Sequence, residues 1–340
     1  MKKTELCRML GIEYPVIQAP MAYITWAEMV AAVSNAGGLG TLGPNSGSRD
    51  PAPDVAEVGR RLRDQIRKVK ALTDKPFAVN FVIYEGVSAV YAGTGKSPND
   101  FSEECVRVAL EEGIPVAVLV GARPEIYTER FKKAGVKVLL HGHPCNVAAA
   151  RHAEQVGVDG FIAVGYGAGG HSGIDKIPTF VLVPEIVDAV HIAVVAGGGI
   201  ADGRGLAAAL TLGAQAVYMG TRFIATRECN AHPRMKQAVI EATDTSTVSW
   251  LGSFGVVRGL KNKMAERCLE LEAKGSNSLE ISSVYGGAAV RAGFLNGDIE
   301  EGSVIFGAAA GLIKDIVSAG EVVRRTVQEA DEVLSGMADR

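Results

Sequence analysis

Short, nearly continuous apolar runs recur along the first two thirds of the chain, and longer amphipathic stretches separate them. The runs are rich in Val, Ile and Leu and do not alternate apolar with polar residues, which is typical of strands buried on both faces of a parallel sheet. This pattern predicts eight strands, at residues 16–20, 38–43, 76–83, 115–121, 137–142, 160–165, 193–198 and 216–221.

The stretches between these strands have the spacing of amphipathic helices. Glycines at the ends of several of them, as in Glu112-Gly113 and Val156-Gly157, are typical of helix C-caps. Eight strands with seven intervening helices indicate an α/β protein that folds as a parallel (β/α)8, or TIM, barrel. A doubly wound open sheet is the alternative, but the even spacing of the eight units favours closure. The helices are predicted at residues 26–36, 55–72, 101–112, 123–134, 145–156, 178–190 and 203–213.

The pattern changes after the eighth strand. Residues 222–300 contain helical stretches at 233–243 and 260–273, but they carry no signal of a buried strand. The segment 303–318 is apolar and rich in small residues, so we expect it to return as a helix on the side of the barrel.

Two parts of the chain follow from this change in pattern. We expect residues 1–224 and 300–340 to form the barrel, and residues 225–299 to form a helical lid segment over its C-terminal face. The long loop at 84–100, after the third strand, is expected to cover the same face.

Composition narrows the class of protein. The chain has 340 residues, of which 47% are apolar and 21% charged, so a large core is expected and disorder is not. Its net charge of -3 gives no electrostatic reason to expect a nucleic acid or an anionic membrane as partner. Five scattered cysteines without a CxxC pair, and the absence of a signal peptide, are typical of a reduced cytoplasm. We expect a cytoplasmic protein with a small-molecule substrate, and a homodimer stays open.

Glycines follow the seventh and eighth strands, where a barrel of this kind usually binds phosphate. Strand seven ends in Gly197-Gly198-Gly199, and strand eight ends in Gly220-Thr221. Glycines let backbone N–H groups approach an anion without interference from a Cβ atom. A tight turn and a helix cap are the simpler explanations of the two clusters. Their joint occurrence at the two expected strands favours a phosphate site.

A histidine lies in the glycine-rich loop that follows strand six. His171 stands in the stretch GAGGHSG (167–173), and an imidazole at the catalytic face can change protonation near neutral pH. We therefore predict that His171 is the catalytic residue. His141 and His143 lie at or just beyond the tip of strand five, where a pocket role is plausible but not assigned. No Asp, Glu or Cys at a suitable spacing completes a metal site with them, so no metal is expected.

The tips of strands one and three carry a further set of candidates. Small residues at Ala19 and Pro20 leave room for a planar ring against the backbone, and Met21 fits a ring contact or the core equally well. Asn80 is polar within an apolar run, and a buried amide is costly unless it is paired. It either bonds a neighbouring loop or meets a ligand, and its place near a strand tip favours the ligand.

Taken together, these stretches resemble the flavin-dependent nitronate monooxygenase (2-nitropropane dioxygenase) family. That family also includes flavin-type enoyl-ACP reductases and NADH:quinone reductases. The likeness covers most of residues 11–235, and the order and spacing of the motifs make it specific. The motifs are YPVIQAPMA (14–22), AGGLGTLG (36–43), PFAVNF (76–81), AGGHSG (168–173), AGGGIADGRG (196–205), MGTRFIATRECNAHP (219–233) and GSVIFGAAAGLIKDI (302–316).

The resemblance implies that the barrel binds FMN. It implies that His171 contacts the substrate beside the flavin, and that Asn80 bonds oxygens of the ring or the ribityl chain. Other motif positions are expected to hold the phosphate, namely Gly198, Gly199, Gly220 and Thr221. A third group is expected to line the isoalloxazine ring, namely Ala19, Pro20 and Met21. We also count the neighbouring Ala168, Gly169, Gly170 and Gly197 among the cofactor-binding residues.

Two activities are compatible with this resemblance. The preferred one is that of a nitronate monooxygenase, which oxidises alkyl nitronates with O2 to a carbonyl compound and nitrite. The alternative is an NAD(P)H-dependent reductase of a quinone or an enoyl thioester, because the segment 219–233 resembles the reductase branches at least as strongly. A flavin-free isomerase or aldolase would need a lysine at a strand tip, whereas Lys75 and Lys137 lie at strand starts. The segment LLHGHPCN (139–146) is longer than the family norm.

Overall fold

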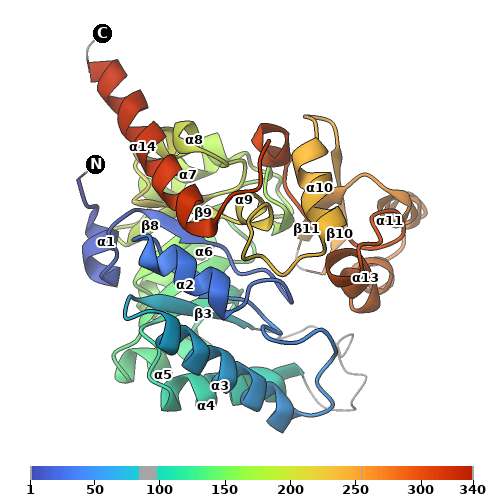
Figure 1. The fold of residues 1–340 in the computed structure, drawn as a ribbon, viewed down its shortest axis with the longest axis horizontal. Helices are drawn as coiled ribbons and strands as arrows, with labels where there is room; N and C mark the ends of the chain where they lie inside the picture. Colours follow the sequence, from blue (N-terminus) through green and yellow to red (C-terminus); the bar gives the residue numbers. More distant parts are fainter. Residues whose placement is uncertain (1, 84–97, 254, 339–340) are drawn as a thin grey trace.

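The computed structural model describes residues 2–83, 98–253 and 255–338. Eight parallel strands form one sheet in the order β1-β9-β8-β6-β5-β4-β3-β2, and a bridge between Ile17 and Leu39 joins its two edges (Figure 1). The predicted (β/α)8 barrel is therefore confirmed, and each strand lies within its predicted run. The strands are β1 (Val16–Gln18), β2 (Gly40–Leu42), β3 (Phe77–Val82), β4 (Val116–Gly121), β5 (Lys137–Gly142), β6 (Gly160–Val164), β8 (Ala193–Gly197) and β9 (Ala216–Met219).

Helices surround the barrel and bury the outer faces of its strands. The last of them, α14, lies beside α8 and α2 and takes the eighth position in the ring (Figure 1). It approaches α8 so closely that a Cβ atom on Gly203 would lie 2.4 Å from the backbone nitrogen of Ala330. The ring consists of α2 (Ala27–Asn35), α3 (Val55–Leu72), α4 (Pro98–Glu111), α5 (Glu125–Lys133), α6 (Val147–Val156), α7 (Thr179–Val187), α8 (Gly203–Thr211) and α14 (Ala319–Ala338).

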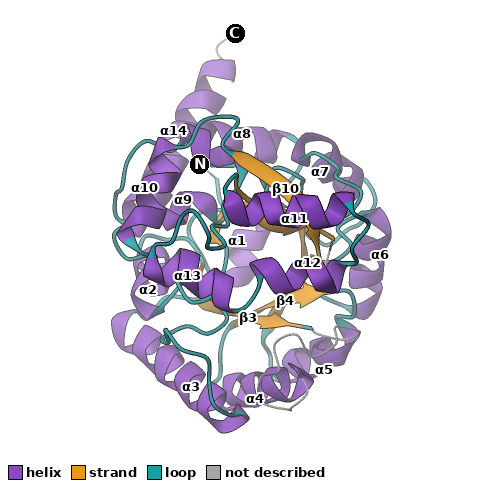
Figure 2. Ribbon diagram, turned by 90° about the vertical axis from the view of Figure 1, so that its right-hand side faces the viewer, coloured by secondary structure: helices purple, strands orange, loops and turns teal. Residues whose placement is uncertain are grey.

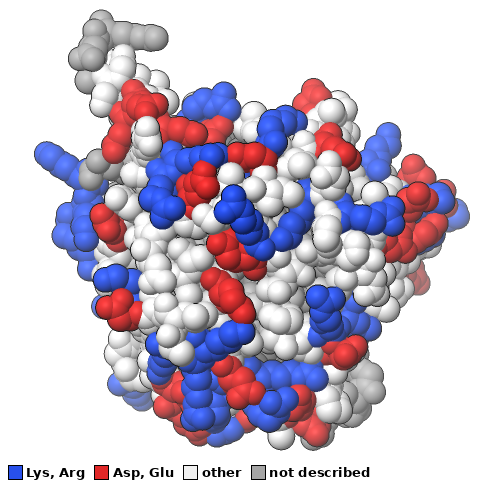
Figure 3. Space-filling model, viewed as in Figure 1, with Lys and Arg blue, Asp and Glu red and all other residues white. Residues whose placement is uncertain are grey.

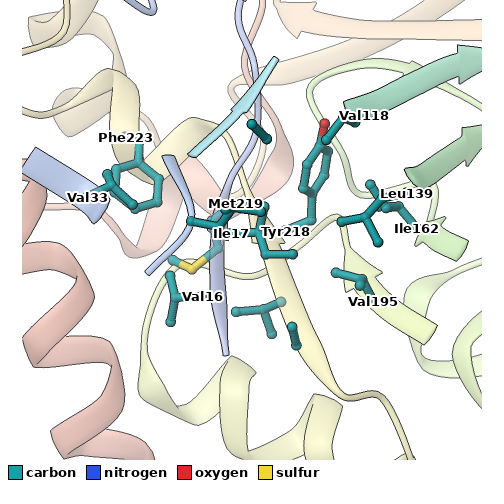
Figure 4. Close-up of a cluster of buried hydrophobic side chains, with 14 of the residues drawn as sticks. Val16, Ile17, Val33, Val118, Leu139, Ile162, Val195, Tyr218, Met219 and Phe223 are labelled. Carbon is teal, nitrogen blue, oxygen red and sulfur yellow. The ribbon is translucent and has the colours of Figure 1, made fainter. Parts of the chain in front are cut away.

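Apolar side chains from neighbouring strands fill the centre of the molecule (Figure 4). Val16 and Ile17 of β1 are fully buried beside Met219 of β9, and Val195 comes from the next strand. This burial on both faces explains why the strands read as continuous apolar runs. A short helix before the barrel, α1 (Glu5–Leu10), is tied to the start of β9, where its Leu6 N–H donates to the side chain of Gln215 at 2.8 Å.

The lid segment, residues 225–299, is only partly helical. It contains an antiparallel hairpin that the sequence analysis did not predict, formed by β10 (Thr247–Gly252) and β11 (Gly255–Leu260). Strand β11 also pairs with β7 (Gly170–Ser172), which comes from the loop after β6. The segment also contains helices, and the one that follows the hairpin in the chain lies in front of β10 (Figure 2). The helices are α10 (Pro233–Glu241), α11 (Lys263–Ala273), α12 (Ser278–Tyr285) and α13 (Ala288–Asn296).

The expectation of no strand in this segment is corrected because only one face of the hairpin is buried in an apolar cluster. Trp250 and Val257 pack against α11 and α12, whereas Ser249 and Arg258 lie opposite each other on the other face. A strand with one polar face does not produce the continuous apolar run that marks the barrel strands.

The apolar segment 303–318 also differs from the prediction of a helix. Only a short 3₁₀ helix, η1 (Ala308–Leu312), forms there, and the helix on the side of the barrel is α14. A Cβ atom on Gly307 would lie 2.6 Å from the backbone nitrogen of Gly169, so this segment packs backbone against backbone. Its apolar character therefore reflects burial. Most of the loop predicted at 84–100 lies outside the described residues.

Basic and acidic side chains are interspersed on the face shown in Figure 3, and neither sign forms a continuous patch there. This pattern agrees with a net charge close to zero. Among the described residues, no helix combines the length and the apolar character needed to cross a bilayer.

Candidate active site

Four backbone N–H groups that have no hydrogen-bond partner in the described parts of the chain lie at the adjoining ends of β8 and β9. They belong to Gly198, Gly199, Gly220 and Thr221, and none donates a hydrogen bond to any other described residue. The two glycines after β8 have φ angles of +88° and +80°. A Cβ atom on Gly199 would meet nothing within 4 Å, so free space adjoins this loop. Unpaired N–H groups beside free space are the donor set that an anionic phosphate requires.

Side chains from two other segments hold these strand ends in place. The hydroxyl of Thr179, at the start of α7, donates to the carbonyls of Gly197 and Gly198 at 3.1 and 2.7 Å. Thr221 begins the short helix α9 (Thr221–Ile224), and its hydroxyl oxygen accepts the N–H of Gly307 at 2.9 Å. The hydroxyl proton of Thr221 is therefore left to donate to a ligand.

The tip of β1 reaches the same place. A Cβ atom on Gly220 would lie 3.6 Å from Cβ of Ala19 and 4.0 Å from Sδ of Met21. The N–H of Ala19 donates to the carbonyl of Met219 at 2.9 Å, which fixes this tip against β9. Pro20 lies between Ala19 and Met21 in the chain and is partly exposed. The fold thus brings the residues predicted to line the ring beside those predicted to hold the phosphate.

Asn80 is buried on β3, and its amide is already half engaged. Its Nδ2 donates to the carbonyl of Val118 on the neighbouring strand β4 at 3.0 Å. The oxygen Oδ1 forms no hydrogen bond within the described parts of the chain. One N–H of the amide is therefore satisfied within the barrel, which leaves the second N–H of Nδ2 and Oδ1 for the predicted contact with a ligand.

The glycine-rich loop after β6 connects the four backbone N–H groups described above, here named the phosphate-type cluster, with the lid segment. A Cβ atom on Gly167 would lie 3.5 Å from Cα of Gly199, and one on Gly198 would lie 3.2 Å from the nitrogen of Ala168. Gly169 is pressed against the backbone of residues 306–307. The loop then becomes β7, in which Gly170 and His171 pair with β11.

A row of aromatic rings leads from the barrel interior to the lid segment. Tyr218 of β9 lies 6.2 Å from His141, and His141 lies 4.4 Å from His143, measured between ring centroids. His143 is 6.3 Å from His171, which is in turn 6.3 Å from Tyr285 of α12. The two histidines that the sequence left unassigned are therefore neighbours of the predicted catalytic residue.

The surroundings of His141 and His171 keep these two imidazoles neutral. Burial lowers the pKa of His171 to about 4. The pKa of His141 is lowered to about 3, first by burial and then by the charge of His171 when that residue is protonated. Its buried Nε2 also has no hydrogen-bond partner among the residues described. At neutral pH both rings are therefore uncharged and can each donate one hydrogen bond and accept one.

Two contributors to the site were not assigned a role from the sequence. Tyr285 is a single tyrosine in a helix, and only the fold brings its hydroxyl to His171. Gly307 lies in an apolar segment, and its role depends on a contact with Thr221. Arg222, beside the phosphate-type cluster, bonds to the carbonyls of Ala225 and Asp315 and is a structural residue. No group of three His, Cys, Asp or Glu side chains suited to a metal was found among the described residues.

Known proteins with the same fold and motifs identify the family. The family model for nitronate monooxygenase matches residues 3–329. The probable nitronate monooxygenase of Staphylococcus aureus strain JH9 is 33% identical, over 79% of this chain and 81% of that protein. The structure of FabK from Thermotoga maritima is 34% identical, with a TM-score of 0.85, and the match covers 100% of this chain and 99% of that one.

A third relative supports the fold alone. The nitroalkane oxidase from Streptomyces ansochromogenes is 24% identical, with a TM-score of 0.79, over 97% of this chain and 99% of that one. The resemblance inferred from the motifs is confirmed by the match over almost the whole length. This chain belongs to the nitronate monooxygenase family of oxidoreductases.

Proposed function

We propose that this protein is an FMN-dependent oxidoreductase that oxidises alkyl nitronates with O2 to a carbonyl compound and nitrite. The observation that carries the proposal is a neutral His171, with a pKa of about 4, one loop away from four unpaired N–H groups, in a chain of this family. Bound FMN would supply the electron chemistry, because no side chain in the site can accept a pair of electrons reversibly.

The donor set fits the phosphate of FMN. The N–H groups of Gly198, Gly199, Gly220 and Thr221 can donate hydrogen bonds to an anion, because none of them has a competing acceptor among the described residues. The space beside Gly199 is free of protein atoms within 4 Å of a Cβ position, which leaves room for phosphate oxygens. Ala19 and Met21, next to Gly220, are suited to contact the adjoining part of the cofactor.

His171 has the chemistry to orient an anionic substrate without adding a charge of its own. A neutral imidazole donates one N–H to a nitronate oxygen, and it accepts a proton only at a pH near or below its lowered pKa. The apolar cluster around Trp250 and Val257 includes Tyr285, whose hydroxyl lies 3.4 Å from Nε2 of His171. Hydrogen bonds are stronger in such surroundings than in water.

A second candidate is an NAD(P)H-dependent reductase of a quinone or an enoyl thioester. The observation that favours it is the similarity to FabK, which extends over the full length of both chains. The same loops would then hold the same cofactor, and the electron donor would change.

Anaerobic mixing separates the two activities. The purified flavin-loaded protein is mixed with propyl nitronate, NADH or NADPH, and loss of flavin absorbance is followed. Rapid bleaching by the nitronate, with release of nitrite once O2 is admitted, is the expected result. Bleaching by a nicotinamide alone favours the reductase. A protein that cannot be loaded with FMN contradicts both proposals.

A further inference from the structure

A tyrosine of the lid segment meets the histidine of the barrel loop. The hydroxyl of Tyr285, on α12, lies 3.4 Å from Nε2 of His171, on β7. Tyr285 is 5% exposed, and its ring packs against Trp250 at a centroid distance of 5.9 Å. The contact therefore joins two segments that are more than one hundred residues apart, in surroundings poor in water.

Two donors already point at the hydroxyl oxygen of Tyr285. The backbone N–H of Ser253 donates to it at 3.2 Å, and the hydroxyl of Ser282 donates to it at 3.2 Å. Ser253 Oγ lies 2.6 Å from Ser282 Oγ, so it can supply the proton that Ser282 accepts in turn. A phenol oxygen has one proton of its own to donate. With two donors directed at the oxygen, that proton is left for Nε2 of His171.

We propose that Tyr285 is a positioning residue that fixes the tautomer of His171. Nε2 accepts the hydrogen bond from the phenol, so the single proton of the neutral imidazole lies on Nδ1. The lid segment thereby decides which nitrogen of His171 can donate and which is occupied. The inference rests on the proposed role of His171 for its functional meaning, but the tautomer itself does not depend on which substrate is oxidised.

Among the described residues, the titratable side chains that face His171 are Tyr285 from α12 and the imidazoles of His143 and His141 from the end of β5. The separation of 3.4 Å is long for a hydrogen bond, and such contacts tighten when a substrate fills the site. Because a hydrogen bond to the lone pair stabilises the neutral ring, its loss favours protonation of His171.

Nitrogen NMR of the flavin-loaded protein tests the tautomer directly. The protein is labelled with ¹⁵N-histidine, and the signals of His171 are assigned with His171→Gln. We expect Nε2 of the wild type to be unprotonated and Nδ1 to be protonated at neutral pH. In Tyr285→Phe, which keeps the ring that packs on Trp250, we expect a mixture of tautomers. A protonated Nε2 in the wild type overturns the proposal, whatever the substrate is.

The pH dependence of kcat/KM gives a second, independent measure. In Tyr285→Phe we expect the acidic limb to move to higher pH by roughly half to one unit, the scale of one hydrogen bond. Ser282→Ala, which keeps the tyrosine, should move it in the same direction by less. The matched control is Ser283→Ala, because Ser283 Oγ donates only to the carbonyl of Glu280, within its own helix. Superimposable profiles for Tyr285→Phe, Ser282→Ala and the wild type contradict the proposal.

Discussion

Gly199 and Gly157 have nearly the same backbone and different surroundings. Their φ angles are +80° and +87°, and a Cβ atom on either would meet no protein atom within 4 Å. Gly157 is the C-cap of α6 and lies about forty residues before the end of β8 in the chain. Gly199 carries one of the N–H groups at the ends of β8 and β9 that have no partner among the described residues. Backbone strain alone therefore cannot distinguish them, and a ligand can.

We predict that Gly199→Val yields a folded protein without flavin. The new side chain enters the space assigned to the phosphate, and the strain of a positive φ is shared by the control Gly157→Val. Flavin content after reconstitution, together with circular dichroism, is the measurement. Equal flavin occupancy in the two variants would show that the phosphate binds elsewhere.

We predict that His171→Ala retains flavin and loses turnover by roughly 10²-fold or more, the usual scale for a group that handles a proton or orients a substrate. The control is His152→Ala, because His152 is exposed on α6 and pairs with Glu125 at 3.2 Å. Steady-state rates and the flavin-to-protein ratio are measured in both. Loss of flavin from His171→Ala would assign the residue to cofactor binding.

At the scale of elements, one buried arginine ties α9 to the segment before α14. Arg222 is 7% exposed and its Nη2 lies within 3.3 Å of the carbonyl of Ala225 and within 3.1 Å of that of Asp315. It also pairs with the carboxylate of Asp315 at 3.0 Å. The start of α9, at the end of β9, is thus anchored to the segment that precedes α14.

We predict that Arg222→Met lowers the free energy of unfolding by about 2 kcal/mol, because it removes the donor from the buried carbonyl of Ala225 and from the partly buried carbonyl of Asp315. Arg325→Met is the control, since Arg325 reaches the same carboxylate at 2.6 Å from an exposed position. We expect it to change the free energy of unfolding by less than about 1 kcal/mol. Urea unfolding of both variants is the measurement, and equal losses would refute the distinction.

How far the sequence predicts each element depends on how its residues are buried. The eight barrel strands were predictable because both of their faces are covered, and α3 begins and ends where its amphipathic pattern does, at Val55 and Leu72. The hairpin of β10 and β11 has one apolar face, so its sequence lacks the continuous apolar run that marks the barrel strands. The segment 303–318 is apolar because it packs against the loop of residues 167–169. This is a tertiary contact, and no local sequence pattern predicts it.

The site divides along the same line. Clusters of glycine at strand ends are local signals, and the structure places Gly220 beside Ala19 and the end of β8 beside β9. The contact of Tyr285 with His171 depends on how the lid segment folds back, and a single tyrosine gives no hint of it. Repeated glycines at strand ends thus sufficed to predict a cofactor site from the sequence, whereas the contact of His171 with Tyr285 required the structure.

For the whole molecule, two neutral histidines make stability depend on pH. The pKa of His171 is about 4 and that of His141 about 3 in the folded state, each lowered by burial from 6.5. Between these values and 6.5 the unfolded chain binds more protons at these two positions than the folded chain does. Stability therefore falls as the pH falls through this window, and it is fully present above about pH 6.5.

We predict that His141→Gln and His171→Gln each flatten this dependence. Urea unfolding between pH 7 and pH 4 gives the slope of the unfolding free energy, and each variant should lose about one proton from the difference between the two states. His152→Gln, at the surface, should keep the slope of the wild type. Parallel curves for all four proteins would contradict neutral, buried rings at positions 141 and 171.

The contacts made by residues 307 and 308 have a consequence for how the protein matures. Their N–H groups donate to the hydroxyl of Thr221 and to the carbonyl of Gly167, so the loops at the strand ends are completed only once these two residues have been synthesised. A nascent chain whose residue 307 is still inside the ribosome has every glycine of the site but lacks the backbone that holds them. We therefore expect a cofactor to load only after residues 307 and 308 have left the ribosome.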